Sequence, residues 1–386
     1  MNYDERALYI HERFRGKIEI KGKTDVKSME DLSVVYTPGV AAPCRGIYEN
    51  PKEIYRYTNK QNTVAIVTDG SAVLGLGNIG AEASIPVMEG KALLFKTFAG
   101  IDAVPICLRT QDSEEMIKTI KEIAPVFGGI NLEDIAAPRC FEIEKRLQEE
   151  LDIPVFHDDQ HGTAIVVTAA LLNASEVAGK RMETLHVVIN GAGAAGTAIA
   201  KMLLSVGVKD LIVCDKAGAL CQGGTKLPPA MQELASITNP RRRKGNLEDI
   251  LEGADVFIGV SAPGVLTADM IRKMAQSPIL FPMANPEPEI WPEEALQAGA
   301  RIIGTGRSDY PNQINNVLAF PGVFKGALQV GAERFTEAMK IAAAKALADA
   351  VPEEQRTESR IIPDVFWPGL SQRVADAVAA AWKKEL

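Results

Sequence analysis

Runs of apolar residues alternate with helix-like segments along most of this 386-residue chain. The strand-like runs are TVAIVTD (63 to 69), DAVPICL (102 to 108), DIPVFHD (152 to 158), LHVVING (185 to 191), KDLIVCD (209 to 215), ADVFIGV (254 to 260), ILFPMAN (279 to 285) and ARIIGTG (300 to 306). Continuous apolar strands separated by helices are typical of parallel sheets that are covered on both faces. The pattern therefore predicts an α/β fold.

The length of the chain favours two domains, because one hydrophobic core seldom serves so many residues. We expect an N-terminal α/β domain over residues 1 to 160 and a Rossmann-like, doubly wound parallel sheet over residues 161 to 386. The second range includes an Ala-rich helical tail after residue 331, whose pattern does not say which domain it packs on. Ligands usually bind between such domains at the carboxyl ends of strands. Residues 157 to 161, near the boundary, are therefore candidates for a site.

Composition and charge narrow the classes of function. Apolar residues make up 46% of the chain and charged residues 24%, which is ordinary for a folded protein. The net charge of −8 argues against a nucleic-acid partner or an anionic membrane, because both require clustered Lys and Arg. No apolar stretch is long enough to cross a bilayer and the first residues lack a secretory apolar segment, so we expect a cytoplasmic protein. The five cysteines are widely spaced and odd in number, which is typical of reduced thiols.

A glycine-rich loop predicts a dinucleotide site. It lies between the strand-like LHVVIN and the helix-like TAIAKMLLSVG, and it consists of Gly191, Ala192, Gly193, Ala194, Ala195 and Gly196. Glycines there allow a tight turn and close approach of the backbone to a pyrophosphate, whose charge is met by the helix N-terminus. Asp215 ends the next strand, where an acid bonds a ribose 2′-hydroxyl and repels a 2′-phosphate, which favours NAD. Lys216 leaves NADP open, since a neighbouring cation accommodates that phosphate.

Two acidic segments predict a metal site. Glu133 and Asp134 follow a small-residue turn, Gly128-Gly129, with three residues between, and Asp158 and Asp159 lie between two histidines after an apolar run. Glu133, Asp134 and one of the other two aspartates would form an oxygen-rich site for a hard cation such as Mg²⁺ or Mn²⁺. The ordinary alternative is that these acids cap helices and turns, where Asp is common. We expect the two histidines to be hydrogen-bonding groups rather than ligands.

Eight separate motifs lie between residues 30 and 330 of the chain. They are YTPGVA (36 to 41), TDGSAVLGLGNIG (68 to 80), EGKALLFKTFAGIDAVPI (89 to 106), INLEDIAAP (130 to 138), FHDDQHGTA (156 to 164), GAGAAG (191 to 196), ANPEPEI (284 to 290) and NQINNVLAFPGVFKGAL (312 to 328). With these motifs the chain resembles the malic enzymes of the short bacterial and archaeal type. The resemblance implies an NAD(P)-dependent oxidoreductase that converts L-malate to pyruvate and CO₂ with Mg²⁺ or Mn²⁺. It also implies a homodimer or a higher homo-oligomer.

The resemblance assigns a catalytic pair. It implies that Lys91 removes the proton of the C2 hydroxyl and that Tyr36 protonates the enolpyruvate carbon. A lysine that is partly desolvated near a bound cation can have its pKa lowered toward neutrality, as a general base at pH 7 requires. The phenol of a tyrosine stays protonated at that pH and can serve as the acid.

The resemblance also assigns the remaining site residues. They are the metal ligands Glu133, Asp134 and Asp159, their close neighbour Asp158, and the substrate contacts Asn285 and Asn315. Two positions depart from the family pattern. Ala72 stands where larger relatives carry an arginine that pairs with a malate carboxylate, and Asn78 stands where the family usually has Asp. Which cation replaces the arginine is open.

Two other functions fit parts of the pattern. Another two-domain NAD(P)-dependent dehydrogenase, for example one that acts on an amino acid, would use a lysine and an aspartate without a metal site. A catalytically silent, nucleotide-sensing regulator could keep the same fold. The presence of Tyr36 and Lys91 argues against the regulator, and a requirement for metal would argue against the other dehydrogenase.

Overall fold

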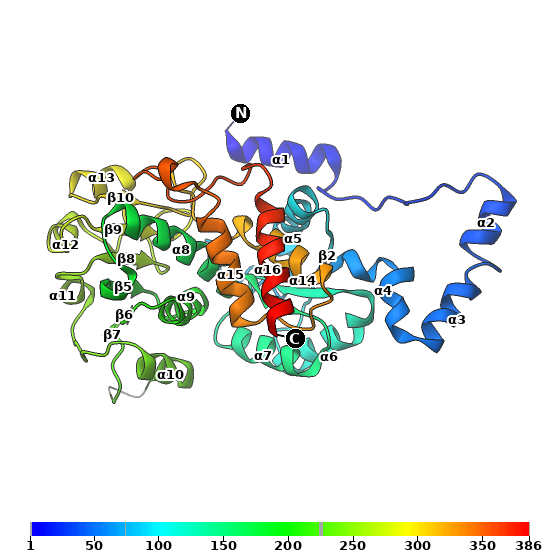
Figure 1. Cartoon of the computed structure of the whole chain (residues 1–386), viewed down its shortest axis with the longest axis horizontal. Coiled ribbons are helices and arrows are strands. Elements are labelled where there is room, and N and C mark those ends of the chain that lie inside the picture. Colours follow the sequence, from blue (N-terminus) through cyan, green and yellow to red (C-terminus); the bar gives the residue numbers. More distant parts are fainter. Residues whose placement is uncertain (1, 74, 224–226, 386) are drawn as a thin grey trace.

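The structure, a computed structural model, describes residues 2–73, 75–223 and 227–385. Its strands are β1 Thr63–Thr68, β2 Asp102–Cys107, β3 Gly129–Leu132, β4 Val155–His157, β5 His186–Asn190, β6 Asp210–Asp215, β7 Gly218–Ala219, β8 Val256–Gly259, β9 Ile279–Pro282 and β10 Ile302–Ile303. They form two sheets, which Figure 1 shows in two bodies side by side. The prediction of two α/β domains, the second of them Rossmann-like, is confirmed.

Helices surround both sheets. They are α1 Tyr3–Phe14, α2 Met29–Val35, α3 Ala41–Glu49, α4 Ile54–Tyr57, α5 Gly80–Ala99, α6 Ser113–Ile123, α7 Arg139–Glu150, α8 Asp158–Val177, α9 Ala194–Ser205, α10 Pro229–Ile237, α11 Leu247–Leu251, α12 Ala268–Arg272, α13 Pro292–Gln297, α14 Phe320–Gln329, α15 Glu337–Ala348 and α16 Leu370–Glu385. Short 3₁₀ helices include η2 Asn59–Asn62 and η5 Asn316–Leu318. Within the described ranges, no helix has both the length and the apolar character that a membrane span needs.

The first sheet has the order β2-β1-β3-β4, and all its neighbouring strands are parallel. Every residue of β1 and β3 is buried, as expected for inner strands that are covered on both faces. Strand β3 is absent from the strands expected from the sequence. It has four residues and opens with Gly129, where a turn had been the natural interpretation of the Gly-Gly pair. The strand places the acids that follow it at an edge of the sheet.

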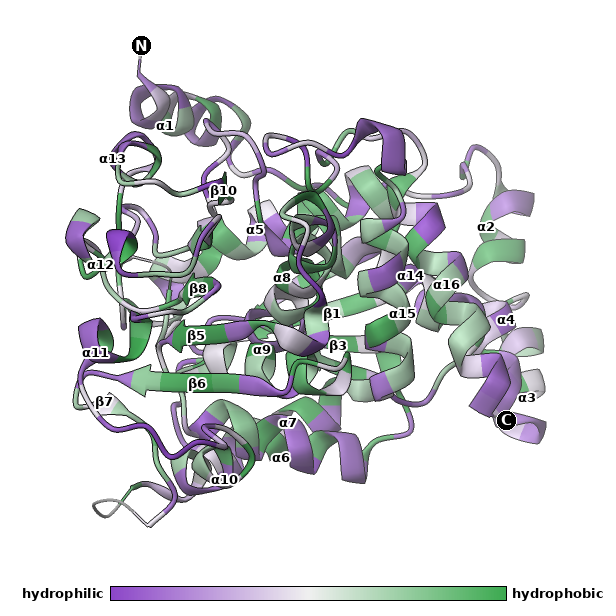
Figure 2. Cartoon of the chain, turned by 60° about the vertical axis from the view of Figure 1, so that its left-hand side comes forward, coloured by the Kyte–Doolittle hydropathy of each residue, from purple (hydrophilic) through white to green (hydrophobic). Residues whose placement is uncertain are grey.

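The second sheet has the order β10-β9-β8-β5-β6-β7, with β7 as its antiparallel edge strand. Figure 2 shows β5 and β6 as mostly hydrophobic, in keeping with their burial. The chain leaves β5 first toward β6 and later returns to β8 on the other side of β5. The carboxyl end of β5 is therefore the topological switch point, where a doubly wound sheet opens a crevice for a ligand.

The helical tail after residue 331 packs on α8, the helix that links the two domains, and on α14, which precedes the tail and itself packs on the first domain. Phe320 and Phe324 of α14 lie against Phe95 of α5, with ring centroids 4.7 and 5.3 Å apart. Helix α15 packs on α8, and α16 packs on both α14 and α15. The expected boundary at residue 160 falls inside the long helix α8, so the exact division of the chain stays a prediction.

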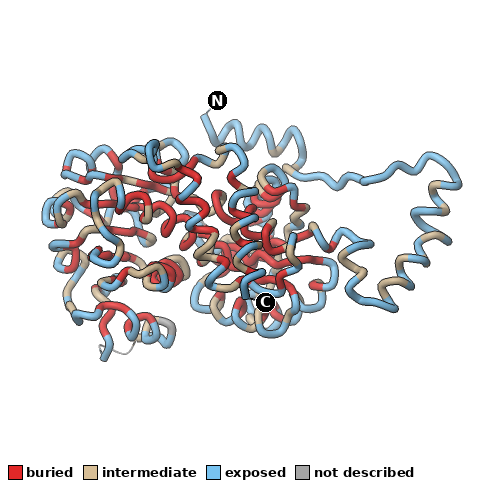
Figure 3. The backbone as a smooth tube through the Cα atoms, in the orientation of Figure 1, coloured by how far each residue is buried: buried red, intermediate tan, exposed pale blue. Residues whose placement is uncertain are grey.

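The first helices form an arm that projects from the first domain. We use "arm" for residues 2–53, which contain α1, α2 and α3. Figure 1 shows α2 and α3 at the end of a long excursion of the chain, and Figure 3 shows almost the whole arm as exposed. None of these three helices contains a buried residue.

Candidate active site

The predicted metal ligands meet because two parallel strands end side by side. In the register of β3 and β4, Leu132 is paired with His157. Glu133 and Asp158 directly follow these two strands, and the carboxyl ends of parallel strands lie at the same edge of a sheet. The two acidic segments, 25 residues apart in the sequence, are thus neighbours because the strands before them are adjacent in the sheet.

Three carboxylates form a compact cluster at this edge. Glu133, Asp134 and Asp159 each offer an oxygen atom, and these oxygens lie within 4.8 Å of one another. The backbone of Asp134 is left-handed, with φ of 54°, and its N–H donates to Asp159 Oδ2 at 2.9 Å. Its carbonyl oxygen accepts from the N–H of Ala72 at 2.9 Å. The turn after β3 is therefore held from two sides, which fixes the direction of the Asp134 carboxylate.

Burial and mutual repulsion raise the pKa values of these acids. Desolvation and the charges of Asp159 and Glu133 raise the pKa of Asp134 to about 9. Desolvation and the charge of Asp158 raise the pKa of Asp159 to about 6. Buried like charges of this kind are unfavourable unless a positive charge joins them. An all-oxygen set of three carboxylates fits Mg²⁺ or Mn²⁺ better than zinc or copper.

Lys91 lies beside the cluster in the middle of α5. Its side chain is 7% exposed, and Nζ contacts Glu133 Oε1 at 2.9 Å and Asp158 Oδ2. The ammonium group also lies 4.1 Å from the centre of the Phe320 ring. Burial by itself lowers the pKa of Lys91, but the charges of Asp158 and Glu133 outweigh it and raise that pKa. Beside these two carboxylates the lysine is a firmly held cation, so a lowered pKa requires that the carboxylates be engaged elsewhere.

Tyr36 lies apart from Lys91 within this chain. It is the C-cap residue of α2 in the arm, and its side chain is 67% exposed. Figures 1 and 2 both show α2 well separated from α5, which carries Lys91. The structure therefore brings the predicted base to the carboxylates but leaves the predicted acid outside.

A buried glutamate that the sequence analysis missed supports the turn from β4 to α8. Glu144 of α7 accepts from the N–H of His157 at 2.9 Å and from Gln160 Nε2 at 3.1 Å, and it pairs with His161 Nε2 at 2.9 Å. His161 is thus a hydrogen-bonding group, as expected. Glu144 lies in a segment with an ordinary helical pattern, and its local sequence does not predict this role. Because it fixes both ends of the Asp158–Asp159 pair, it is a positioning residue for the carboxylate cluster.

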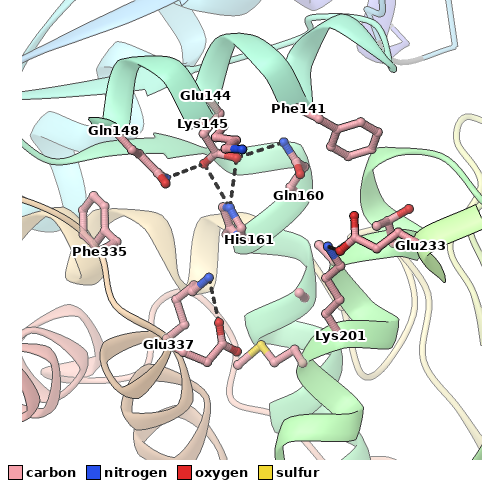
Figure 4. Close-up of a pocket in the computed structure, with 15 residues that line it drawn as sticks. Phe141, Glu144, Lys145, Gln148, Gln160, His161, Lys201, Glu233, Phe335 and Glu337 are labelled. Carbon is pink, nitrogen blue, oxygen red and sulfur yellow. Dashed lines mark hydrogen bonds and ion pairs between the residues drawn. The ribbon is translucent and has the colours of Figure 1, made fainter. Parts of the chain in front are cut away.

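A cavity of about 430 Å³ adjoins Glu144 and His161 between α7, α8, α9 and α15. Figure 4 shows that several of its charged side chains pair with one another. Lys201 contacts Glu233 at 2.6 Å, and Lys340 contacts Glu337 at 2.9 Å. None of the predicted metal ligands lines this cavity. The candidate site is therefore the carboxylate edge and not this cavity.

A second set of contacts that the sequence analysis did not predict fixes the start of the loop of residues 70–80. Asp69, buried at the end of β1, contacts Arg139 Nη2 at 2.8 Å, and the same nitrogen donates to Ser71 Oγ at 3.0 Å. The loop includes Ala72, which is exposed beside Asp134, and Asn78, whose side chain exchanges hydrogen bonds with Gln111 at 3.0 and 3.2 Å. Arg139 is committed to Asp69 and Ser71, so it is not a free replacement for the arginine absent at position 72.

The two predicted substrate amides lie on loops of the second domain. A Cβ atom on Gly75 would lie 2.8 Å from Pro286 Cδ, so the loop of residues 70–80 touches the segment of Asn285. Asn285 Nδ2 donates to the carbonyl of Met283 at 3.3 Å. Asn315 caps η5 through its side-chain oxygen, which accepts from the N–H of Val317 at 3.0 Å and leaves its NH₂ group for other partners. The assignment of Asn285 and Asn315 to the substrate stays a prediction.

The glycine loop has the geometry that close approach of a phosphate requires. Gly191 has φ of 126°, and a Cβ atom there would lie 2.5 Å from the carbonyl oxygen of Val260. A Cβ atom on Gly196 would lie 1.8 Å from the carbonyl oxygen of Gly191. Around Gly193, by contrast, no described atom lies within 4 Å of such a Cβ, so this position is open at the start of α9. The loop sits at the switch point of the sheet and fits a pyrophosphate.

Replacing Gly196 with alanine is expected to lower both the melting temperature and the affinity for nucleotide, since the new methyl group must displace the loop. The cost of such overpacking is about 1–3 kcal/mol. Gly193→Ala is the matched variant, because its methyl group meets open space. It should keep the wild-type melting temperature and weaken nucleotide binding alone. Thermal unfolding and a fluorescence titration with reduced nucleotide test both, and an unchanged melting temperature for Gly196→Ala would contradict the prediction.

Comparison with known proteins agrees with this geometry. Residues 15–148 match the family model described as "Malic enzyme, N-terminal domain", and residues 160–382 match "Malic enzyme, NAD binding domain". The chain is 54% identical over 382 residues to the bifunctional malic/malolactic enzyme of Bacillus subtilis, covering 99% of this chain and 93% of that protein. It is 57% identical to the NAD-dependent malic enzyme of Geobacillus stearothermophilus, covering 99% and 79%. The crystal structure of the NAD-dependent malic enzyme of Thermotoga maritima superposes with a TM-score of 0.94 at 50% identity, covering 97% of this chain and 98% of that one.

Proposed function

The chain belongs to the malic enzyme family, and we propose that it converts L-malate to pyruvate and CO₂ with a divalent cation and NAD. One observation carries the proposal most directly. The cluster of buried Glu133 and Asp134 with half-buried Asp159 lies against Lys91 at an edge of the first sheet, and the loop beside it touches the second domain at Pro286. An NAD-dependent dehydrogenase without metal chemistry has no use for three clustered carboxylates, two buried and one half-buried, that repel one another.

The residues of the chain divide the work of the reaction. Glu133, Asp134 and Asp159 would hold the cation, and Asn285 and Asn315 would orient malate. When bound, the cation would stabilise negative charge on the oxygens of the substrate, and the nicotinamide would accept hydride.

Lys91 is the proposed general base. Glu133, once it serves as a ligand, holds the Lys91 proton less strongly, so the pKa of Lys91 falls from its raised value. Asp158 stays in contact with the lysine and keeps Nζ in place. The neutral amine can then take the proton of the C2 hydroxyl. Tyr36 would later supply a proton to the carbon from which CO₂ has left.

Asp215 supports NAD as the nucleotide. It ends β6, and its Oδ1 accepts from the N–H of Ala217 at 2.8 Å, so the carboxylate is fixed in the turn to β7. A fixed carboxylate there suits a ribose 2′-hydroxyl and repels a 2′-phosphate. The relative from Geobacillus stearothermophilus is named as NAD-dependent, in agreement with this choice.

The test is an absorbance assay for nicotinamide reduction with purified protein and L-malate. NAD⁺ and NADP⁺ are compared, each with Mn²⁺ and with excess EDTA, and pyruvate is measured at the end. We expect reduction that is faster with NAD⁺, is abolished by EDTA and yields one pyruvate per reduced nucleotide. Reduction that persists in EDTA would favour a dehydrogenase without metal chemistry. A folded protein that binds nucleotide and reduces none would overturn the proposal in favour of a silent regulator.

A further inference from the structure

A buried carboxylate of the second domain lies outside both the carboxylate cluster and the glycine loop. Glu289, in the segment ANPEPEI (284 to 290), is 0% exposed. Its Oε1 accepts from the N–H of Ser261 at 3.0 Å, and its Oε2 accepts from the N–H of Ala284 at 3.0 Å. Burial of a carboxylate is unfavourable unless hydrogen bonds compensate for it. Here each oxygen has a backbone N–H as its partner, so the carboxylate is fixed between two segments of the chain.

The two N–H groups lie just beyond the carboxyl ends of neighbouring strands. Ser261 lies two residues after β8, and Ala284 lies two residues after β9. In the register of these parallel strands Gly259 is paired with Pro282, so the two segments leave the sheet side by side. A carboxylate suits a position between two such donors, because it has two acceptor atoms and no hydrogen of its own when ionised. Glu289 therefore joins the ends of the two strands.

Each of the joined segments leads to a different substrate of the proposed reaction. Ser261 Oγ accepts from Asn190 Nδ2 at 2.7 Å, and Asn190 directly precedes Gly191 of the glycine loop. Ala284 directly precedes Asn285, the predicted malate contact. One oxygen of Glu289 is thus bonded to the segment that supports the nucleotide loop. The other oxygen is bonded to the segment that carries the malate contact.

The backbone makes room for this carboxylate and holds it from a second side. A Cβ atom on Gly259 would lie 2.4 Å from Glu289 Cδ, so a side chain at the end of β8 would displace the carboxylate. The carbonyl of Glu289 accepts from the N–H of Leu266 at 3.1 Å, and the carbonyl of Pro288 accepts from the N–H of Gly264 at 3.2 Å. Both donors lie in the segment after β8. The backbone around Glu289 is therefore fixed as well as its side chain.

We propose that Glu289 is a positioning residue, which holds the nucleotide loop and Asn285 at the spacing that hydride transfer requires. Misplacement of reacting groups by about 1 Å can cost about a hundredfold in rate, so the relative position of the two segments matters for this step. Glu289 acts through the segments to which it is bonded. The inference rests on the proposed function, because it concerns the hydride step of that reaction.

Glu289→Gln tests the proposal, because it keeps the size of the side chain and changes its hydrogen bonding. An amide has one oxygen and one NH₂ group, so one of the two N–H groups loses its acceptor and faces a donor. We expect turnover to fall about ten- to a hundredfold while the variant keeps the wild-type affinity for NADH. The isotope effect on turnover of L-malate with deuterium at C2 should rise, because hydride transfer then limits turnover more than product release does.

Hydrogen exchange provides a measurement that needs neither nucleotide nor turnover. In the nucleotide-free protein the backbone N–H groups of Ser261 and Ala284 should exchange faster in Glu289→Gln than in the wild type, since a bond that protects them is lost. Glu287→Gln is the matched control, because Glu287 lies in the same segment and is exposed. It should keep the wild-type turnover, isotope effect and exchange.

Ser261→Ala is a milder variant that decides the test if Glu289→Gln does not fold. It removes the acceptor of Asn190 Nδ2 and keeps the backbone N–H that donates to Glu289, so it weakens the connection on the nucleotide side alone. The isotope effect should rise in the same direction as in Glu289→Gln, but by less. An isotope effect equal to that of the wild type in a folded Ser261→Ala variant would count against the proposal.

Two results with Glu289→Gln would overturn the positioning role. One is wild-type turnover with a wild-type isotope effect. The other is a loss of turnover that follows the loss of nucleotide affinity and of melting temperature with an unchanged isotope effect, which would make Glu289 a support of the fold alone. An inactive wild-type protein would count against the proposed function instead. The exchange measurement then decides on Glu289, and equal exchange in the variant and the wild type would show that its bonds do not hold the two segments.

Discussion

Replacing Lys91 with alanine is expected to lower malate turnover by about two to four orders of magnitude, which is the usual contribution of a positioned general base. The variant loses the amine and leaves Glu133 and Asp158 buried without their cation. Loss of one partner of a buried ion pair costs about 3–5 kcal/mol, so the melting temperature should fall as well. Turnover is therefore measured with saturating Mn²⁺ at a temperature where the variant is folded. Added small primary amines should restore part of the rate by occupying the space of the missing side chain.

Lys96 provides the matched control for this result. It lies in the same helix, its side chain is 61% exposed, and it contacts Asp102 at 2.6 Å on the surface. Lys96→Ala should keep the wild-type turnover within about twofold, because exposed ion pairs contribute little. If Lys91→Ala kept most of the wild-type rate, or if its loss were explained fully by unfolding and no amine restored it, Lys91 would not be the base.

The sequence predicted the contents of this site better than its arrangement. The acids Glu133 and Asp158 could be placed together only by knowing that the strands before them are neighbours. Strand β3 is too short to be recognised from its sequence pattern. The motifs identified both acidic segments but did not show that the two strands before them are neighbours in one sheet. The support from Glu144 could not be predicted, because a glutamate in an amphipathic helix is ordinarily exposed and this one is buried by tertiary packing.

Tyr36 shows a different limit. Its motif identifies the residue, but the position of a side chain relative to a second segment depends on where the intervening chain goes. Residues 18–53 leave the body of the molecule and return to it, which no local pattern of apolar residues reveals. The glycine loop, by contrast, could be predicted well from its local sequence. Its function depends on contacts within six residues and with the adjacent strand, so the fingerprint predicted both its place and its geometry.

Asp159→Asn is expected to abolish metal-dependent turnover while leaving the metal-free fold at least as stable as the wild type. The amide keeps an oxygen that can accept from the N–H of Asp134, so the turn survives. One negative charge is removed from a largely buried cluster of like charges, which reduces their repulsion. Affinity for Mn²⁺ should fall by more than about a hundredfold, the upper end of the cost of losing only an outer hydrogen bond to a ligand. Turnover against Mn²⁺ concentration and metal-free thermal unfolding measure the two effects.

The pH dependence of stability separates this account from simple damage to the fold. Folding raises the pKa of Asp134 to about 9 and that of Asp159 to about 6, so the folded state binds these protons more tightly than the unfolded chain. The metal-free wild type therefore loses stability as the pH rises from about 4 toward these values. Mn²⁺ should raise its melting temperature more at high pH than at low pH, and Asp159→Asn should lose most of that increase.

Asp376→Asn on α16 is the control for this comparison, because Asp376 is exposed and bonded only to Gln372 in the part of the chain that the structure describes. It should show the full wild-type response to Mn²⁺. An Asp159→Asn variant that still responds to Mn²⁺ as the wild type does would show that the aspartate is not a ligand. A metal-free variant that melts well below the wild type at high pH would show that the charge at position 159 stabilises the fold, contrary to the repulsion among the carboxylates.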